Sequence, residues 1–194
     1  MASVGATPAK LNSYAAKLLP ALRKVGDATG APLSTRTKED RIRLQKVVYL
    51  LKVSGYVPAQ RFEYNLYING PYSPDLTQVY FSVDPNEFVK GPRAPDLNPE
   101  VLRFVEEADK EGVTFLEALA TVLDLFARSG GSHAGVALAW AKSIKPHISD
   151  AEWMKVRLFL SRHPEMLKRP APLPPLRRRH YDDGGPDPFV ASEG

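Results

Sequence analysis

The chain has 194 residues, a net charge of +4 at pH 7, and 43% hydrophobic against 25% charged residues. These values are typical of one globular domain with a real core rather than of a disordered protein. The chain contains no cysteine, which excludes disulfides, thiol nucleophiles and cysteine-ligated metal sites. No apolar stretch approaches the roughly 18 residues of a membrane-spanning helix, and we see no secretory signal. We therefore expect a cytoplasmic protein that does not bind a membrane.

The first part of the chain is predicted to form two helices. Apolar residues in the range 11–25 recur with a helical period, and Pro20 inside that pattern predicts a kinked or split helix. Thr37 and Asp40 have the spacing of a capping box at the start of the next helix. Gly55 is expected to end that second helix.

One short strand is predicted next. Apolar and polar residues alternate over residues 62–69, which indicates a half-buried strand. A single strand is not stable alone, and the candidate partners are residues 57–58 or 88–90. A Gly-Pro pair then breaks the strand, and Ser73 followed by Pro74 has the pattern of a capped helix start.

The second half of the chain is predicted to be helical. Helices are expected to begin at Asn98, at Thr114 with Glu117 as its capping-box partner, and at Ser149. Another helix is marked by the apolar residues Val136, Trp140 and Ile144. The predicted fold class is therefore mainly α, a compact domain of about six to seven helices with a small antiparallel β element.

The ends differ in composition from this body. We predict a disordered N-terminus (residues 1–9), a single helical domain (residues 10–163) and a flexible tail rich in Pro and Arg (residues 164–194). Proline removes backbone donors and favours extended conformers, so the tail does not readily form a packed element. The tail is interpreted as a solvated segment, with a basic segment that contacts a partner as the alternative. The spacing from Pro172 to Arg177 also matches a polyproline ligand of SH3-type grooves.

No catalytic residue, metal site or cofactor site is predicted. The four histidines are scattered, none has another histidine at helical spacing, and all are interpreted as structural. The carboxylates between residues 96 and 124 are interpreted as a solvated helical face, with an acidic docking surface as the alternative. A base, a nucleophile and an oxyanion site cannot be assembled from neighbouring motifs, so we expect a protein that is not an enzyme.

The segment around the predicted strand is the leading candidate for a binding site. Three tyrosines, a Gly-Pro turn and a helix start fall within residues 64–74, and tyrosine gives a large contact area at low entropic cost. The alternative is that these tyrosines cover a second small core. The predicted protein-docking edge comprises Lys46, Tyr49, Tyr67, Asn69, Tyr72 and Ser73.

A basic stripe is the second candidate. Cations spread around a helix with one apolar face are able to contact phosphates, although a solvated helix surface predicts the same sequence. The nucleic-acid-binding candidates are Arg36, Arg41, Arg43 and Lys46 in the body, with Arg177, Arg178 and Arg179 in the tail.

Four short segments resemble a known family. Residues 44–50 (LQKVVYL), 67–76 (YINGPYSPDL), 119–122 (LATV) and 144–149 (IKPHIS) look like motifs of the prokaryotic YwgA-like family. The first two of these segments are also similar, more distantly, to the phage-associated Panacea antitoxin domain. The resemblance covers residues 36–163.

The chain departs from the family pattern in two places. Asn69 stands where an aromatic residue often precedes Gly-Pro, and a Val-Val pair replaces a typical Leu-Leu pair. The Panacea relatives imply small antitoxins that neutralise partner toxins by binding them. We therefore expect a non-enzymatic module that binds a toxin or a larger complex in a prokaryotic defence, phage or toxin–antitoxin system. The alternative is a nucleic-acid-binding accessory protein, and neither function requires a cofactor.

Overall fold

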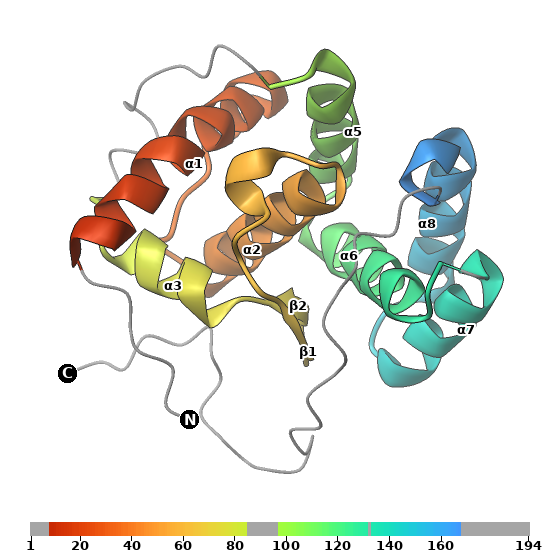
Figure 1. Ribbon diagram of the computed structural model, residues 1–194. Helices are drawn as coiled ribbons and strands as arrows, with labels where there is room; N and C mark the ends of the chain where they lie inside the picture. The colour runs from red at the N-terminus through yellow and green to blue at the C-terminus, as the bar shows by residue number, and fades with distance from the viewer. Residues whose placement is uncertain (1–7, 85–96, 132, 168–194) are drawn as a thin grey trace.

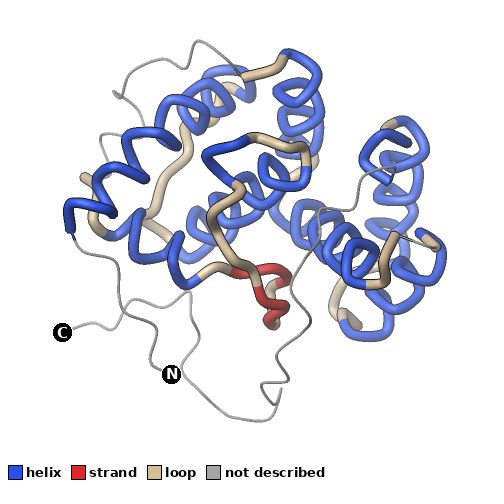
Figure 2. Tube along the Cα trace, in the orientation of Figure 1, coloured by secondary structure: helices blue, strands red, loops and turns tan. Residues whose placement is uncertain are grey.

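The computed structural model describes residues 8–84, 97–131 and 133–167. This part of the chain is mainly helical with one two-stranded antiparallel sheet, which confirms the predicted fold class. Figure 2 shows the hairpin in red against a body made of helices. No helix that the structure describes is long and apolar enough to cross a bilayer.

The described part of the chain contains seven helices, two strands and two 3₁₀ turns. The helices are α1 (Pro8–Thr29), α2 (Lys38–Val53), α3 (Pro74–Phe81), α5 (Pro99–Lys110), α6 (Val113–Arg128), α7 (Ala134–Ile144) and α8 (Asp150–Arg162). The strands are β1 (Asn65–Tyr67) and β2 (Gly70–Tyr72), and the short 3₁₀ turns are η1 (Val57–Ala59) and η2 (Pro164–Leu167).

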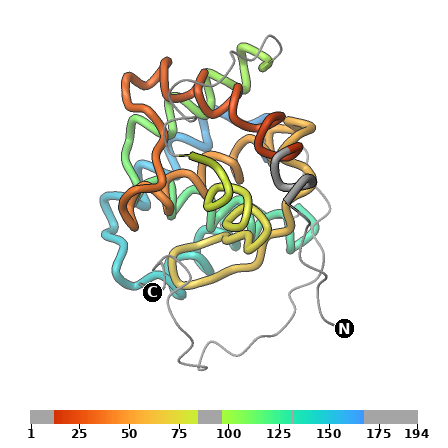
Figure 3. The backbone as a smooth tube through the Cα atoms, turned by 90° about the vertical axis from the view of Figure 1, so that its left-hand side faces the viewer, coloured from red at the N-terminus to blue at the C-terminus, as the bar shows by residue number. Residues whose placement is uncertain are grey.

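Two central helices organise the core. Helix α2 contacts α5, α6, η1 and β2, and α6 also contacts α7 and α8. Figure 1 shows α1 and α3 on one side of α2, with α7 and α8 on the far side of α6. In the view turned by 90°, α3 lies in front of the core (Figure 3). Almost every residue of α2 from Arg41 to Lys52 is buried, including its polar side chains, so α2 forms the centre of the core together with α6.

The N-terminal helices agree with the sequence only in part. Helix α1 continues through Pro20 and ends at Thr29, so of the predicted kink or split the split is wrong. The hydroxyl of Thr29 donates to the carbonyl of Val25 at 3.0 Å, which caps the last turn. The capping box of α2 is confirmed, because the backbone N–H groups of Thr37 and Asp40 each donate to the other residue's side chain at 3.0 Å.

The predicted strand lies where the sequence indicated, but the predicted partner segments were wrong. β1 pairs with β2, the segment directly after the turn, with Leu66 opposite Pro71. Residues 57–58 lie in η1 instead, and residues 88–90 lie outside the described residues. Because proline has no N–H, Leu66 and Pro71 form the pair that exchanges no backbone hydrogen bonds. The hydrogen bonds between the strands belong to the neighbouring pairs, Asn65 with Tyr72 and Tyr67 with Gly70. The period of two also fails at the turn, where Ile68 is 70% exposed although Tyr64, predicted for the same face, is 1% exposed.

Local capping patterns predicted most later helix starts. The side chains of Ser73, Asn98 and Ser149 accept the expected backbone hydrogen bonds at the starts of α3, α5 and α8. The capping box at Thr114 was wrong, because α6 begins after Gly112 and its N-terminus has no side-chain cap. Glu117 instead faces the loop after α7, where its carboxylate pairs with Lys145 and contacts His147.

Helix α7 exposes the residues that marked it. Val136 and Trp140 are 61% and 44% exposed, whereas Ala137 and Ala141 are buried against the core. Small side chains let two helices approach closely, and α7 makes its main contact with α6. The body also extends beyond the predicted boundary at residue 163, because η2 packs on α8 and α6. The remaining residues of the two ends predicted to be disordered, 1–7 and 168–194, lie outside the described residues.

Candidate interaction site

Buried side chains hold the hairpin segment by its carbonyl oxygens. Two strands of three residues are marginal in water without further strands or a helix to pack on. Here donors from two helices, α2 and α6, and from the loop after α7 take that place along residues 60–73. The donors and acceptors are Lys52 to Gln60 (2.9 Å) and Phe62 (2.6 Å), Arg128 to Tyr64 (2.8 Å), Lys145 to Tyr67 (3.1 Å) and Ile68, Lys46 to Pro71 (2.7 Å), and Gln45 to Ser73 (3.0 Å).

Gln45 fixes the junction between the hairpin and α3. Its amide nitrogen donates to the Ser73 carbonyl and to the Thr77 hydroxyl, both at 3.0 Å. Its amide oxygen accepts from the Ser73 backbone N–H at 3.0 Å. Both Gln45 and Ser73 are fully buried, so these bonds replace solvation that the groups have lost. The glutamine of the LQK segment and the serine of the PYSP segment are therefore direct partners.

Gly70 packs closely on Thr121 and Lys46 beneath the hairpin. Gly70 has φ +82°, and a Cβ there would lie 2.9 Å from the Thr121 hydroxyl oxygen and 3.3 Å from Cε of Lys46. Lys46 is fully buried, and its burial lowers the pKa of the ammonium to about 7, against the opposing charges of Glu117 and Asp124. Only glycine combines this backbone conformation with this spacing.

A second charged group lies deeper, around Asp124. This carboxylate is fully buried and accepts from Arg128 at 2.6 Å and from the Tyr49 hydroxyl at 3.3 Å. Burial raises the pKa of Asp124 although the Arg128 guanidinium opposes that shift, and burial also raises the pKa of Tyr49. Arg128 thus links this carboxylate to the carbonyl of Tyr64 at the base of the hairpin.

The tip of the hairpin is held by Lys145. Its ammonium donates to the carbonyls of Tyr67 and Ile68 and pairs with Glu117 at 3.0 Å. An ammonium has three donors, so these contacts use its full capacity. His147 adds a 3.1 Å contact to the same Glu117 oxygen. Burial lowers the pKa of Lys145, and Glu117 opposes that shift.

We expect Lys46→Met to change how stability depends on pH. Below about pH 7 both the folded and unfolded states hold the Lys46 proton, and the folded state bears the full cost of the buried charge. Between about pH 7 and the unfolded pKa of 10.5 the unfolded state binds more protons, so stability rises with pH. The limit is about 1.4 kcal/mol per pH unit. Urea titrations of the wild type and the variant between about pH 7 and 9.5 measure this slope.

The expected result is a steeper rise for the wild type than for Lys46→Met, because Lys52 and Lys145 contribute equally to both proteins. Lys38→Met is the matched control, since Lys38 lies exposed at the start of the same helix, and its slope is expected to equal that of the wild type. Parallel curves for the wild type and Lys46→Met would show that Lys46 titrates normally.

The structure brings the predicted docking residues together, and most of them lie inside. Lys46, Tyr49 and Ser73 are fully buried and Tyr72 is 5% exposed, so these four support the hairpin from within. Tyr67 and Asn69 are half-buried, and the Tyr67 ring packs edge-on against Tyr72 with ring centroids 5.1 Å apart. The side chains available for direct contact are those of the turn, including Ile68, which was not among the predicted residues.

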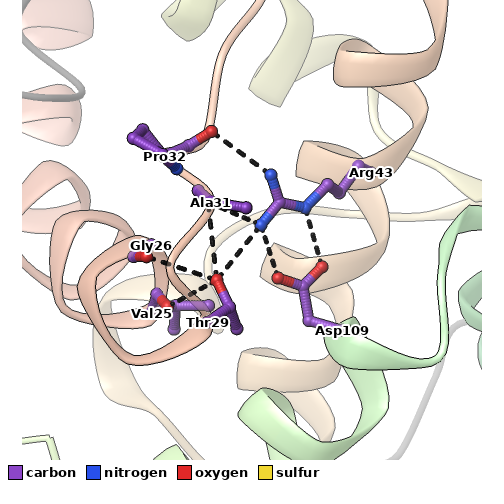
Figure 4. A network of polar contacts seen from close by, with 7 residues as sticks. All are labelled: Val25, Gly26, Thr29, Ala31, Pro32, Arg43 and Asp109. Carbon is purple, nitrogen blue, oxygen red and sulfur yellow. Dashed lines mark hydrogen bonds and ion pairs between the residues drawn. The ribbon is translucent and has the colours of Figure 1, made fainter.

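The basic stripe is not a stripe of free cations. Arg41 is 8% exposed and donates to the Thr35 carbonyl at 2.9 Å. Arg43 pairs with Asp109 at 2.5 Å and also donates to carbonyls of the preceding loop (Figure 4). Lys46 is buried beneath the hairpin, and of the predicted body residues only Arg36 is exposed. Arg177, Arg178 and Arg179 lie outside the described residues. This arrangement does not favour a phosphate-contacting surface on α2.

Two of the histidines, His147 and His163, contact carboxylates. His163 contacts Glu107 at 3.0 Å and Glu165 at 3.2 Å between two phenylalanine rings. Within the described ranges, no three His, Asp or Glu side chains are grouped so as to hold a metal ion.

Sequence reasoning missed the donors that lie far along the chain from the hairpin. Arg128 and Lys145 were not singled out, because a buried lysine or arginine has no local pattern that distinguishes it from an exposed one. Only an indirect signal for these donors was available in the sequence, because a hairpin with strands of three residues needs partners for its carbonyls.

Comparisons with known proteins identified no relative of this chain. No protein-family model matches the chain, and the searches of curated proteins and of solved structures found no match either.

Proposed function

We propose that this chain is a non-enzymatic protein-interaction module whose contact point is the hairpin tip, formed by Tyr67, Ile68 and Asn69. The observation that supports it is the exposed Ile68, 70% exposed on a turn whose backbone is anchored by the buried Lys145. A single exposed apolar residue is ordinary on a protein surface. Here it stands on a segment whose carbonyls are held by buried charges at considerable desolvation cost.

Anchoring favours binding because it lowers the entropy that a loop loses when a partner orders it. A contact residue on a preorganised turn gives more affinity than the same residue on a mobile one. Tyr67 adds aromatic area beside Ile68, and its ring is already fixed against Tyr72. The tip therefore suits a partner with an apolar pocket for Ile68 and polar groups around it.

The same anchoring argues for contact through side chains rather than through an added strand. Strand addition needs backbone donors and acceptors along a free edge. The carbonyls of Tyr64, Tyr67 and Ile68 already accept from Arg128 and Lys145. A partner strand would have to displace these buried cations.

We further propose an antitoxin-like protein, or an accessory subunit, in a prokaryotic defence, phage or toxin–antitoxin system. The support is the resemblance of the LQK and GPYSP segments to the YwgA-like and Panacea families. In this chain Gln45, Lys46, Gly70 and Ser73 build the anchored hairpin. The resemblance thus supports a shared hairpin, and the partner class follows by analogy.

The test is native purification from the source cell after nuclease treatment, with the wild type and two variants as bait. Ile68→Asp places a charge in the proposed contact and is expected to weaken binding by about 2 kcal/mol or more, roughly 30-fold in Kd. Its effect on folding is expected to stay within about 0.5 kcal/mol because the side chain is exposed. Phe81→Asp is the control, at an apolar residue that is 53% exposed on α3.

A stoichiometric protein that is lost with Ile68→Asp and kept with Phe81→Asp supports the proposal. A partner that is kept by both variants contradicts the assignment of the tip. Material that disappears with nuclease would favour the nucleic-acid alternative instead.

A further inference from the structure

An apolar groove lies on the side of the molecule formed by α1, η1 and the start of α5. Its volume is about 590 Å³, and its lining includes Pro20, Ser54, Tyr56, Val57, Pro58 and Val101. Val57 is 79% exposed, the largest exposure among the exposed large hydrophobic residues of the described chain. The Tyr56 hydroxyl donates to the Lys17 carbonyl at 3.3 Å and so ties one wall of the groove to α1. The groove is distinct from the hairpin tip.

The described chain ends beside this groove. η2 packs on α8 and α6, and Sδ of Met166 lies 4.0 Å from the hydroxyl of Ser54, which lines the groove. Leu167 is the last described residue. Residues 168–194 follow directly, so the segment after Leu167 starts within a few residues of the groove wall.

The first part of that segment has the composition such a groove accepts. Residues 170–176 read PAPLPPL and carry no charge, between the Lys168-Arg169 pair and the three arginines from Arg177. Proline-rich segments favour the extended polyproline conformation, which docks into grooves lined by aromatic and apolar side chains at low entropic cost. Tyr56, Val57 and two prolines provide such a lining.

We propose that residues 170–176 of the chain's own tail occupy this groove. A short connection gives an effective concentration on the order of mM, so an interaction with a Kd of about 0.1 mM as separate molecules keeps the groove about nine-tenths filled within one chain. The tail thus covers the exposed apolar surface of Val57, and a proline-rich segment of another protein must displace it to bind there.

Spin labelling tests this in the full chain. The protein has no cysteine, so Ala171→Cys gives one site for a nitroxide. Nuclear magnetic resonance of the labelled chain is expected to show selective loss of amide signals at Tyr56, Val57 and Val101. Signals of α7, including Val136, are expected to remain. Signal loss spread evenly over the surface would overturn the proposal.

Three sets of variants and a mixing experiment define the occupant. Adding Leu173→Asp and Leu176→Asp to the labelled chain, or Val57→Asp in the groove, is expected to abolish the selective loss, and Val136→Asp on α7 to leave it unchanged. In a mixture of labelled chain without ¹⁵N and ¹⁵N chain without cysteine, no loss is expected. Selective signal loss in that mixture would mean that the tail of a second copy fills the groove. Selective signal loss that persists in the chain with Leu173→Asp and Leu176→Asp would mean that the apolar segment is not the contact. Either result would overturn the proposal.

Discussion

Asp109→Ala is expected to lower the free energy of unfolding by about 3–5 kcal/mol, because it leaves a nearly buried guanidinium without its carboxylate. Nε and Nη2 of Arg43 donate to the two Asp109 oxygens at 2.8 and 2.5 Å. The two side chains are only 14% and 1% exposed. Arg43 also donates to the carbonyls of Ala31 at 2.7 Å and Pro32 at 3.2 Å (Figure 4), so the pair joins α2, α5 and the loop after α1.

Denaturant unfolding of Arg43→Leu, Asp109→Leu and the double variant Arg43→Leu/Asp109→Leu, beside Asp109→Ala, measures this pair. The double variant is expected to be less destabilised than the sum of the single effects, since it leaves neither charge buried. Lys110→Ala is the matched control, because its pair with Glu106 is exposed and such pairs contribute less than about 1 kcal/mol. A loss of that small size for Asp109→Ala would show that the Arg43 pair behaves as a surface ion pair.

Gly70→Ala is expected to cost about 3 kcal/mol, as the sum of two effects. A non-glycine residue at φ +82° is strained by about 1–3 kcal/mol. The new Cβ would also lie 2.9 Å from the Thr121 hydroxyl oxygen and 3.4 Å from the Glu117 carbonyl oxygen, and such overpacking costs typically about 1–3 kcal/mol. Urea unfolding at constant pH measures the total.

Gly130→Ala separates the two effects. Gly130 has φ +75°, but a Cβ there meets nothing within 4 Å. This control is therefore expected to show the backbone strain alone and to be the less damaging of the two. Equal losses for both variants would mean that the hairpin does not press on α6 as closely as the distances indicate.

Local sequence patterns predicted the elements better than their faces. Caps at Thr37, Ser73 and Asn98 are decided by neighbours three residues away or fewer, so the sequence contains the whole interaction. The face of α7 is decided by α6. Val136 and Trp140 gave the apolar pattern, but Ala137 is buried in their place because a small side chain permits close helix packing.

The hairpin is the candidate site for a different reason from the one that the sequence suggested. The cluster of tyrosines pointed to residues 64–74, yet the structure buries Tyr49 and Tyr72 and exposes Ile68. Lys145 reaches the Tyr67 carbonyl from 78 residues away. Such contacts depend on the packing of whole helices, and a lysine in the sequence does not reveal whether it lies in solvent or holds a buried carbonyl.

Native-state hydrogen exchange of the hairpin amides tests the central claim most directly, namely that buried side chains anchor a two-stranded sheet. If they do, the amides of Tyr67 and Tyr72 open only with the core, and their protection is expected to match that of Val48 in α2 and Leu119 in α6. Exchange of these amides at rates typical of frayed ends would contradict the claim. It would also remove the preorganised tip on which the proposed function rests.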